Sequence, residues 1–344
     1  DAQLSRGLGD VYKRQDNKHL IHPWSEFSED SFDMTQVSKA DGIYLYDAHG
    51  NKLIDGPGGM WCVNIGYGRK EMADAISQQI MNMTYSSPWF TTNEPAAMLA
   101  KVITEKTPGD LNRVFFSNGG SDAVDTALRF VQYRNNVIGR PDKKKILCRE
   151  KGYHGSSYLA ATVSGTGREH DRRYMDTHQD LAIMLPNINP YIRPIGTSLE
   201  EWCNEKISEM EETILSIGSD KIGCFIAEPI LASGGVIVPP SGYHQRSLEL
   251  CKKHDIVYIS DETVTGFGRL GHWFASKEVF GIQPDIITCA KGLTSGYLPM
   301  GAAIISERLI DNIKNKDGSQ PFTNGYTYSC HPVAAKAALT NIEI

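Results

Sequence analysis

The chain has 344 residues and a formal net charge of -6, with 35 Lys and Arg residues against 41 Asp and Glu residues. This length is sufficient for one large core or two smaller ones. Binding to a phosphate backbone needs a basic face, so the charge balance argues against nucleic acid as a partner. No apolar run approaches the length of a bilayer span, and we expect a soluble protein without a membrane segment.

The seven cysteines are odd in number and form no CxxC pair. Several lie in apolar, strand-like stretches, where a free cysteine behaves as a small hydrophobe. This usage favours a reducing, cytoplasmic location. The histidines are scattered and give no support for a metal site.

The beginning of the chain shows two unlike stretches. Residues 1–15 have neither helical nor strand periodicity, and we interpret them as a leader unrelated to the rest. Residues 19–32 mix His, Pro, Trp and Phe, which indicates an irregular arm. Such an arm packs either on a partner or on its own core.

A hairpin and a glycine-rich loop come next. Residues 42–55 alternate between apolar and polar side chains around a turn, which predicts a β-hairpin. Residues 56–68 are glycine-rich and carry one large ring, Trp61. A tryptophan on a pliable loop can wall a pocket, although filling a core is its more common use.

Helical and strand patterns alternate through the rest of the chain. We expect helices over 69–81, 96–106, 121–137, 199–217 and 242–254, and strands over 113–116, 145–148, 222–227, 256–260, 285–290 and 302–306. This alternation predicts an α/β fold with a mostly parallel sheet covered by helices on both faces. A last helix begins at His331 and reaches the end of the sequence without a cap or a closing loop.

In such a sheet, ligands bind at the carboxyl ends of the strands. The first predicted strand of the sheet ends in a turn with Gly119 and Gly120, and a helix follows at Ser121. The N–H groups at a helix start favour an anion, and the pattern fits one phosphate better than a dinucleotide or a triphosphate. The alternative is an ordinary tight turn with Ser121 as N-cap. Asp122 and Asp125 suit the helix dipole without a ligand and mildly oppose a phosphate.

Two further strands end in charged residues. Residues 256–260 deliver Asp261, a carboxylate that would be costly to bury without a cation or donors. Arg269 is one candidate structural partner. Residues 285–290 end at Lys291, which either reaches out to water or takes part in chemistry.

Together these features match the requirements of one cofactor, pyridoxal phosphate. The helix start would bind its phosphate, Asp261 would keep its pyridine nitrogen protonated, and Lys291 would hold its aldehyde as a Schiff base. Tyr153, in another strand-to-glycine turn, offers an aromatic ring to stack on the cofactor.

At these positions the sequence resembles a class III pyridoxal-phosphate aminotransferase of fold type I, and in detail it is similar to the amine:pyruvate (omega-transaminase) branch. The resemblance extends over 19–344. The segments that carry it are MWCVNIGYGRKE, RVFFSNGGSDAVDTALR, KGYHGSSY, AEPILASGGVIVPPSGY, DETVTGFGRLGHWF, PDIITCAKGLTSGYLPMGA and FTNGYTYSCHP.

The resemblance implies a role for each matching residue. Lys291 matches the Schiff-base lysine and Asp261 the partner of the pyridinium. Tyr153 and Thr263 match the residues on the two faces of the ring. The phosphate cup is matched by Gly120 and Ser121.

Four other positions carry implied roles. Thr327 matches a phosphate contact donated by the neighbouring subunit, so the resemblance implies a homodimer. Glu228 matches an acidic residue near the cofactor. Trp61 and Phe90, with Tyr153, match positions that wall the substrate pocket.

The sequence also departs from the family pattern. Leu231 stands where many relatives carry a glutamine that can hydrogen-bond the ring hydroxyl. Cys330 replaces the usual glycine before His331, where a side chain crowds the backbone. Relatives continue into a C-terminal domain with an arginine for the substrate carboxylate, and we expect that domain to be missing from this sequence.

The resulting domain prediction has four parts. We expect a leader over 1–15, an N-terminal arm, hairpin and helix over 16–80, a large cofactor-binding domain over 81–328, and the start of an incomplete small domain over 329–344.

The implied reaction is a ping-pong transfer of an amino group from an amine or omega-amino acid to a keto acid, with pyruvate as the expected acceptor. One alternative is an aminomutase or racemase of the same fold, which would not depend on an added keto acid. Another is an inactive fragment without the carboxylate-binding domain.

Overall fold

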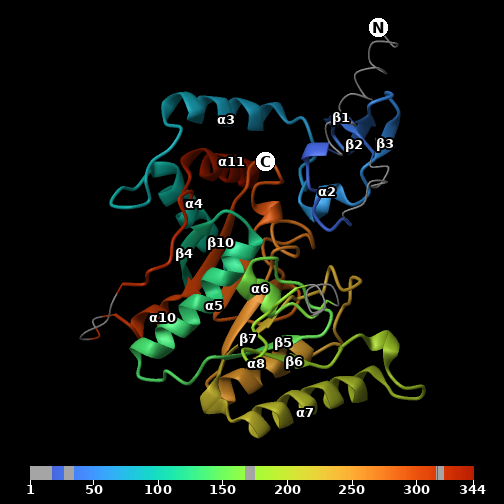
Figure 1. Ribbon diagram of the computed structural model, residues 1–344, viewed down its shortest axis with the longest axis vertical. Coiled ribbons are helices and arrows are strands. Elements are labelled where there is room, and N and C mark those ends of the chain that lie inside the picture. The colour runs from blue at the N-terminus through green and yellow to red at the C-terminus, as the bar shows by residue number, and fades with distance from the viewer. Residues whose placement is uncertain (1–17, 27–34, 167–174, 315, 317–320) are drawn as a thin grey trace.

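A computed structural model describes residues 18–26, 35–166, 175–314, 316 and 321–344. The expected leader and a large part of the expected arm lie outside these residues. The described chain forms a large mixed sheet with helices around it and a small sheet near the N-terminal end (Figure 1).

The large sheet has seven strands in the order β4-β10-β9-β8-β7-β5-β6. Five neighbouring strands are parallel to one another, and β10 runs antiparallel to both of its neighbours. The strands are β4 (Leu111–Ser117), β5 (Lys145–Arg149), β6 (Ala182–Leu185), β7 (Ile222–Ala227), β8 (Val257–Asp261), β9 (Ile286–Cys289) and β10 (Gly301–Ser306). The prediction of a mostly parallel α/β sheet is confirmed.

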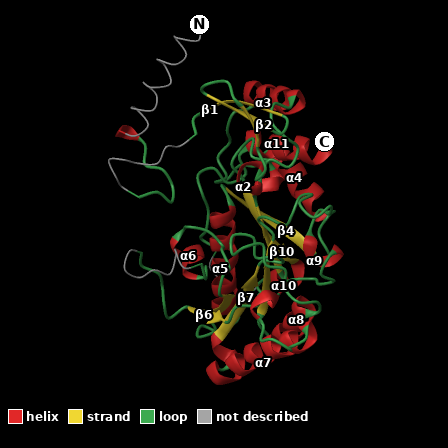
Figure 2. Ribbon diagram, turned by 90° about the vertical axis from the view of Figure 1, so that its right-hand side faces the viewer, coloured by secondary structure: helices red, strands yellow, loops and turns green. Residues whose placement is uncertain are grey.

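Helices cover both faces of this sheet because its strands are apolar on both sides. Along β7, Cys224 and Ile226 pack in a core with helix α5, whereas Phe225 and Ala227 pack in a core with helices α7 and α8. Side chains alternate between the faces of a strand, so a continuous apolar run needs cover on both. Figure 2 shows α5 and α6 on one side of the strands and α8 on the other.

The helices are α2 (Gly58–Trp61), α3 (Lys70–Asn82), α4 (Glu94–Thr104), α5 (Gly120–Val137), α6 (Tyr158–Thr162), α7 (Leu199–Ile217), α8 (Tyr243–Lys253), α9 (Ala275–Glu278), α10 (Glu307–Asp311) and α11 (Pro332–Glu343). The five longer predicted helices are present with ends shifted by at most a few residues. Ser198 and Glu201 form a capping box at the start of α7, which explains its sharp beginning.

A third core lies at the β4 end of the sheet. Apolar residues of α4 and α11 pack there against β4, β9 and β10. Helix α11 also contacts α3, and the two lie side by side at the top of Figure 1. The last described helix is thus part of the packing around the large sheet.

The small sheet consists of β1 (Val37–Asp41), β2 (Tyr44–Asp47) and β3 (Lys52–Ile54), all antiparallel. The predicted hairpin is its β2–β3 pair. The turn between them is held by Asp47, whose carboxylate accepts hydrogen bonds from the backbone of His49 and Asn51.

Among the described residues no helix is long and apolar enough to cross a membrane. Over the same residues, no group of histidines, cysteines and carboxylates is arranged to hold a metal ion. All seven cysteines are free thiols.

Candidate active site

The predicted charged residues meet at the carboxyl edge of the sheet. Asp261 is the last residue of β8, and Lys291 follows the neighbouring strand β9 by two positions. Glu228 directly follows β7, on the other side of β8. Parallel strands end at one edge, so residues far apart in sequence share one crevice.

Asp261 is buried, and both of its carboxylate oxygens accept hydrogen bonds within the protein. One oxygen, Oδ1, accepts bonds from the Thr263 backbone at 3.1 Å, the Thr263 hydroxyl at 2.6 Å and the Thr288 hydroxyl at 3.0 Å. The other, Oδ2, lies 2.7 Å from Nδ1 of His154, which is also buried. Arg269 instead donates to Asn64 at 2.5 Å, so the alternative of an Asp261–Arg269 pair is wrong.

Asp261 and His154 form a buried pair in which both side chains are stabilised in their charged forms. Burial alone raises the pKa of Asp261, but the bond and charge of His154 and the bonds from Thr263 outweigh it and hold this pKa below its ordinary 3.8. Burial likewise lowers the pKa of His154, yet Asp261 raises it above the ordinary 6.5. Each group thus stabilises the charged form of the other.

Lys291 begins the short turn η3 (Lys291–Leu293) and is largely shielded from water. Burial lowers the pKa of its ammonium, while Asp261, Glu228 and Cys62 partly restore it. Its Nζ atom lies 5.8 Å from the centre of the Trp61 ring. Lys291 therefore faces the glycine-rich loop, and the alternative of a lysine that simply reaches out to water is wrong.

Helix α5 begins without a side-chain cap. Its N-cap residue is Gly119, and the Ser121 hydroxyl accepts a bond from the Ser156 backbone at 3.1 Å. The alternative in which Ser121 is an N-cap is therefore wrong. The first N–H groups of this 18-residue helix are available to an anion at the same edge of the sheet as Asp261.

Two glycines allow three segments to meet at the start of α5. A Cβ atom on Gly120 would lie 2.9 Å from Cγ2 of Thr263, and one on Gly155 would lie 2.4 Å from Oγ of Ser121. Gly155 also has a positive φ of 138°. These contacts bring the Tyr153 turn, the helix start and the residues after Asp261 together.

The acidic residues in the first turns of α5 have structural partners. Asp125 accepts a bond from the Ala160 backbone at 2.8 Å and so holds α6 against α5. Asp122 accepts a weaker bond from the Asn118 backbone at 3.3 Å. These contacts explain why two carboxylates lie beside a helix start that is open to an anion.

Tyr153 and Glu228 are joined through the backbone. One oxygen of Glu228 accepts from the Tyr153 N–H at 2.9 Å and the other from the Ala232 N–H at 3.0 Å. Burial raises the pKa of Glu228 to about 7, although the charge of His154 opposes this. The Tyr153 hydroxyl lies 3.0 Å from the Ser156 hydroxyl, which fixes the end of the ring.

Phe90 and Thr327 lie apart from this group within the described chain. The Phe90 side chain is 95 % exposed and packs edge to face on Trp89, at 5.6 Å between ring centres. Thr327 is also exposed, and it lines a groove of about 820 Å³ together with Trp89 and Tyr85. Within the described residues, neither is hydrogen-bonded to Lys291 or Asp261.

The two departures from the family pattern have structural consequences. The Leu231 side chain is buried in the core beside α7 and α8 and offers no polar atom. Cys330 has a positive φ of 58°, a region that glycine adopts more easily, and its carbonyl accepts a bond from Asn93 at 2.9 Å. The backbone at Cys330 is therefore in a conformation that costs a residue with a side chain more than it costs glycine, and crowding by the side chain stays a prediction.

His154 is a site residue that the sequence did not reveal. It comes directly after Tyr153, but a single histidine in a loop carries no charge pattern. Its backbone N–H donates to the Ser164 hydroxyl at 2.9 Å, which fixes the turn. Its proximity to Asp261 depends on the order of β5, β7 and β8 in the sheet.

Comparisons with known proteins agree with this arrangement. The family model for aminotransferase class-III matches residues 27–344. The putrescine–pyruvate aminotransferase of Pseudomonas aeruginosa is 36 % identical over 346 residues, covering 100 % of this chain and 75 % of the relative.

Solved structures show the same fold. An (S)-enantioselective omega-transaminase of Thermomicrobium roseum has a TM-score of 0.91 and 34 % identity, and the match covers 97 % of this chain and 74 % of that one. An omega-transaminase of Pseudomonas jessenii, in complex with PMP, has a TM-score of 0.91 and 32 % identity, with 96 % and 73 % covered. The matched sheet is that of fold type I. The chain belongs to the class-III aminotransferase family.

Proposed function

We propose that the protein is a pyridoxal-phosphate-dependent aminotransferase that moves an amino group from an amine or omega-amino acid to a keto acid, with pyruvate as the acceptor. The observation that carries the proposal is the pairing of two buried strand ends. Asp261 is held as a carboxylate by His154, and Lys291, on the next strand, has a lowered pKa. The pyruvate-using relative supports the choice of acceptor.

The residues present fit pyridoxal phosphate. The uncapped start of α5, at Gly120 and Ser121, suits a phosphate. Asp261 would hold the pyridine nitrogen, a contact that a buried, charged carboxylate favours. Tyr153 and Thr263 would lie on the two faces of the ring.

Glu228 contributes through its position. Its carboxylate holds the Tyr153 N–H, so it fixes the turn that would carry the ring cover. Its raised pKa, about 7, places its titration near neutral pH. Leu231 offers no hydrogen bond, so a nearby ring hydroxyl would need another partner.

When bound, pyridoxal phosphate supplies an aldehyde that condenses with amines and a ring that draws electrons away from the substrate carbon. Lys291 supplies the proton transfer. Because burial lowers the pKa of its ammonium, a larger share of Nζ is neutral and able to accept a proton from the substrate carbon. The same Nζ then returns that proton as a general acid.

The reaction would proceed in two half-reactions that share one site. The amine leaves as a ketone or aldehyde, and the keto acid then receives the amino group. Trp61, which faces Lys291, would limit the size of the amine. Tyr153 would form a second wall of the same pocket.

Thr327 and Phe90 would act in this reaction through a homodimer, in which each lies near the active site of the other subunit. Both lie on an exposed surface that also carries Trp89, which is 74 % exposed. Large exposed aromatic groups are typical of protein interfaces. A second copy would bring Thr327 to the phosphate and Phe90 to the pocket of its partner. We place the enzyme in the cytoplasm.

The test uses purified protein, added pyridoxal phosphate, a panel of amines beginning with putrescine, and pyruvate. We expect the amine to be consumed only when pyruvate is present, with one alanine formed for each amine lost, since an aminomutase or racemase would convert the amine without pyruvate. K291A should lower turnover at least about 1,000-fold because it removes the acid–base group. K277A, at an exposed lysine of α9, is the matched control and should retain activity. Full turnover of K291A would contradict the proposal.

A further inference from the structure

The turn that carries Lys291 has an unusual backbone. Lys291 and Ser295 have positive φ values of 44° and 49°, and Gly296 has one of 76°. Residues with side chains adopt this region rarely, and they stay in it only where their surroundings hold them there. The contacts that hold this turn therefore determine where the lysine side chain begins.

One of these contacts comes from α11. Asn341 lies near the end of that helix, and its side chain is only 8 % exposed. Its Nδ2 atom donates to the carbonyl of Gly292 at 2.9 Å and to the carbonyl of Leu293 at 3.0 Å. An amide nitrogen carries two hydrogens, so both are used on the two residues that follow Lys291.

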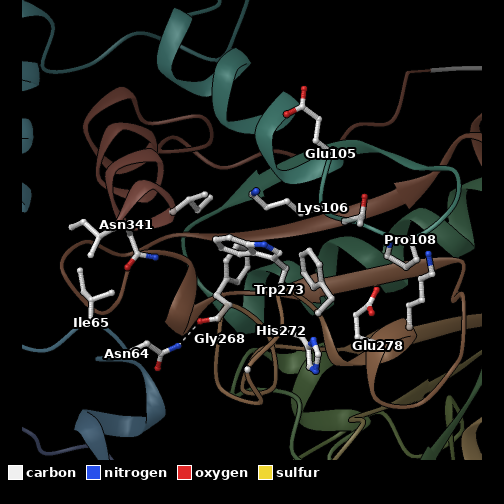
Figure 3. A pocket seen from close by; sticks show the side chains of 17 residues that line it. Asn64, Ile65, Glu105, Lys106, Pro108, Gly268, His272, Trp273, Glu278 and Asn341 are labelled. Atoms are coloured by element: carbon white, nitrogen blue, oxygen red, sulfur yellow. Dashed lines mark hydrogen bonds between the residues drawn. The ribbon is translucent and has the colours of Figure 1, made fainter.

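A second asparagine packs against the same turn from another segment. Asn64 donates to the Phe267 carbonyl at 2.8 Å, and a Cβ atom on Gly292 would lie 2.5 Å from the donating nitrogen. Figure 3 shows Asn64 and Asn341 on the same side of a cavity of about 800 Å³, with the bond from Asn64 drawn as a dashed line. The turn is thus held between the glycine-rich loop and α11.

The choice of asparagine in α11 is not explained by the helix itself. Asparagine is a weak helix former, and within the described chain the Asn341 Oδ1 atom is buried without a hydrogen-bond partner. Both features disfavour this residue at a buried helical position. The donor half of the amide, which binds the Lys291 turn, is the part with a function.

We propose that Asn341 is a positioning residue for Lys291, which it holds through the carbonyls of Gly292 and Leu293. The inference rests on the proposed role of Lys291 in binding pyridoxal phosphate. Helix α11, which packs on α3 and α4, would thus contact the turn that carries the lysine and fix its position. The amide holds the backbone and leaves Nζ free to move between atoms.

The experiment compares N341L with T340V in the full chain. Leucine keeps the branching of Asn341 at Cγ, is larger, and removes both donated bonds. Thr340 is the neighbouring residue, also buried, and its hydroxyl has no partner among the described residues. T340V therefore controls for a polar-to-apolar change in the same helix turn. N341D, which keeps the shape but cannot donate when ionised, is the second variant.

The first readout is amide hydrogen exchange without cofactor. The N–H groups of Leu293, Thr294 and Ser295 all bond within the turn. We expect them to exchange about tenfold faster in N341L and N341D than in the wild type, because the loss of a hydrogen bond of this kind typically raises the local opening equilibrium by about that factor. Exchange in T340V should match the wild type. Equal exchange in all four proteins would overturn the inference.

The second readout is the visible absorbance of lysine-bound pyridoxal phosphate during titration. We expect the half-saturating concentration to rise about tenfold in N341L and to stay unchanged in T340V. Wild-type protein that binds no pyridoxal phosphate would contradict the proposed function, while the exchange result would still decide whether Asn341 holds the turn. Unaltered binding in both Asn341 variants would overturn the positioning role.

Discussion

The neighbouring ends of β8 and β9 are held in opposite ways. Asp261 is held by its side chain, which has bonds to His154, Thr263 and Thr288. Lys291 is held by its backbone, whose turn is bound by Asn341, while its Nζ lies 5.8 Å from the Trp61 ring and forms no hydrogen bond or ion pair with the described residues.

This difference corresponds to the two proposed tasks. A carboxylate that stabilises a fixed positive charge works best when its position and ionisation are fixed, because nothing has to reorganise during the reaction. A lysine that accepts a proton at one atom and returns it at another has to keep a mobile side chain. Changes on the two strand ends should therefore have different consequences.

The largest expected effect is that of D261N. Asparagine keeps the size of Asp261 but removes its charge, so kcat should fall about 1,000-fold, the upper range for loss of one electrostatic partner at a reacting group. The melting temperature should change much less than kcat. Measuring both separates a chemical role from a structural one, and near-normal kcat would contradict the role of Asp261.

The next effect concerns the partner of Asp261. H154L leaves a buried carboxylate unpaired, and we expect it to lower the free energy of unfolding by about 3 kcal/mol near pH 6. The fold should survive because leucine can fill a buried site. Urea unfolding of the wild type and the variant would measure the loss.

The pH dependence of this loss sharpens the test. The pKa of His154 is raised, so its stabilising contribution is complete below pH 6.5 and is lost as the pH rises through the raised value. The pKa of Asp261 is lowered, so its contribution is present above pH 3.8 and is lost as the pH falls. The effect of H154L should thus be greatest between about pH 4 and 6.5.

His244 provides a matched control for that experiment. It is also buried, but burial lowers its pKa to about 4, so it stays neutral from pH 5 upward. The unfolded chain protonates His244 below its ordinary pKa of 6.5 while the folded protein does not, so the cost of H244L should be constant above about pH 7 and should fall as the pH drops toward 5, the opposite trend to that of H154L. A cost of H154L that does not rise as the pH drops from 9 toward 5 would contradict the charged pair.

On the lysine side, G292A tests the backbone clamp. The added Cβ would lie 2.5 Å from the Asn64 amide, so the turn or the glycine-rich loop has to move. We expect a loss of about 2 kcal/mol in stability, typical of overpacking, together with weaker cofactor binding. G56A, where a Cβ would meet nothing within 4 Å, is the control and should be nearly neutral.

The smallest expected effect is that of T288V. It removes one of the hydrogen bonds to Asp261, at 3.0 Å, and leaves those of His154 and Thr263. The free energy of unfolding should fall by about 1 kcal/mol, with kcat little changed. A large loss of activity would show that Asp261 is held less firmly than its set of bonds indicates.

The sheet and its longer helices could be predicted because their signals are local. Strands buried on both faces appear as apolar runs, and the long helices have regular apolar spacing. The sequence does not predict the short elements β1, β6, α2, α6, α9 and α10. Each has only a few residues, and their packing on other segments defines them more than their own pattern does.

The residues of the candidate site also divide into those with a local sequence signal and those without one. Asp261 and Lys291 were predictable because a charge at the end of an apolar strand is conspicuous. His154, Asn64 and Asn341 were not, since each becomes significant only through a partner many residues away. The homodimer contact of Thr327 and the pocket-wall role of Phe90 stay predictions, because one chain cannot supply the surface that Thr327 would meet.

The antiparallel strand β10 has a consequence for how the chain folds. Within the part of the chain that the structure describes, strand β4 lies at the edge of the sheet and pairs only with β10, as in Phe116 opposite Ala302. During synthesis β4 therefore stays unpaired for roughly 10–40 s, which is the time needed at ordinary elongation rates to synthesise the chain as far as β10. Until then the start of α5 has no fixed place beside β9. Pairing of such distant segments slows folding, so this edge is where we expect chaperone dependence and heat-induced aggregation to begin.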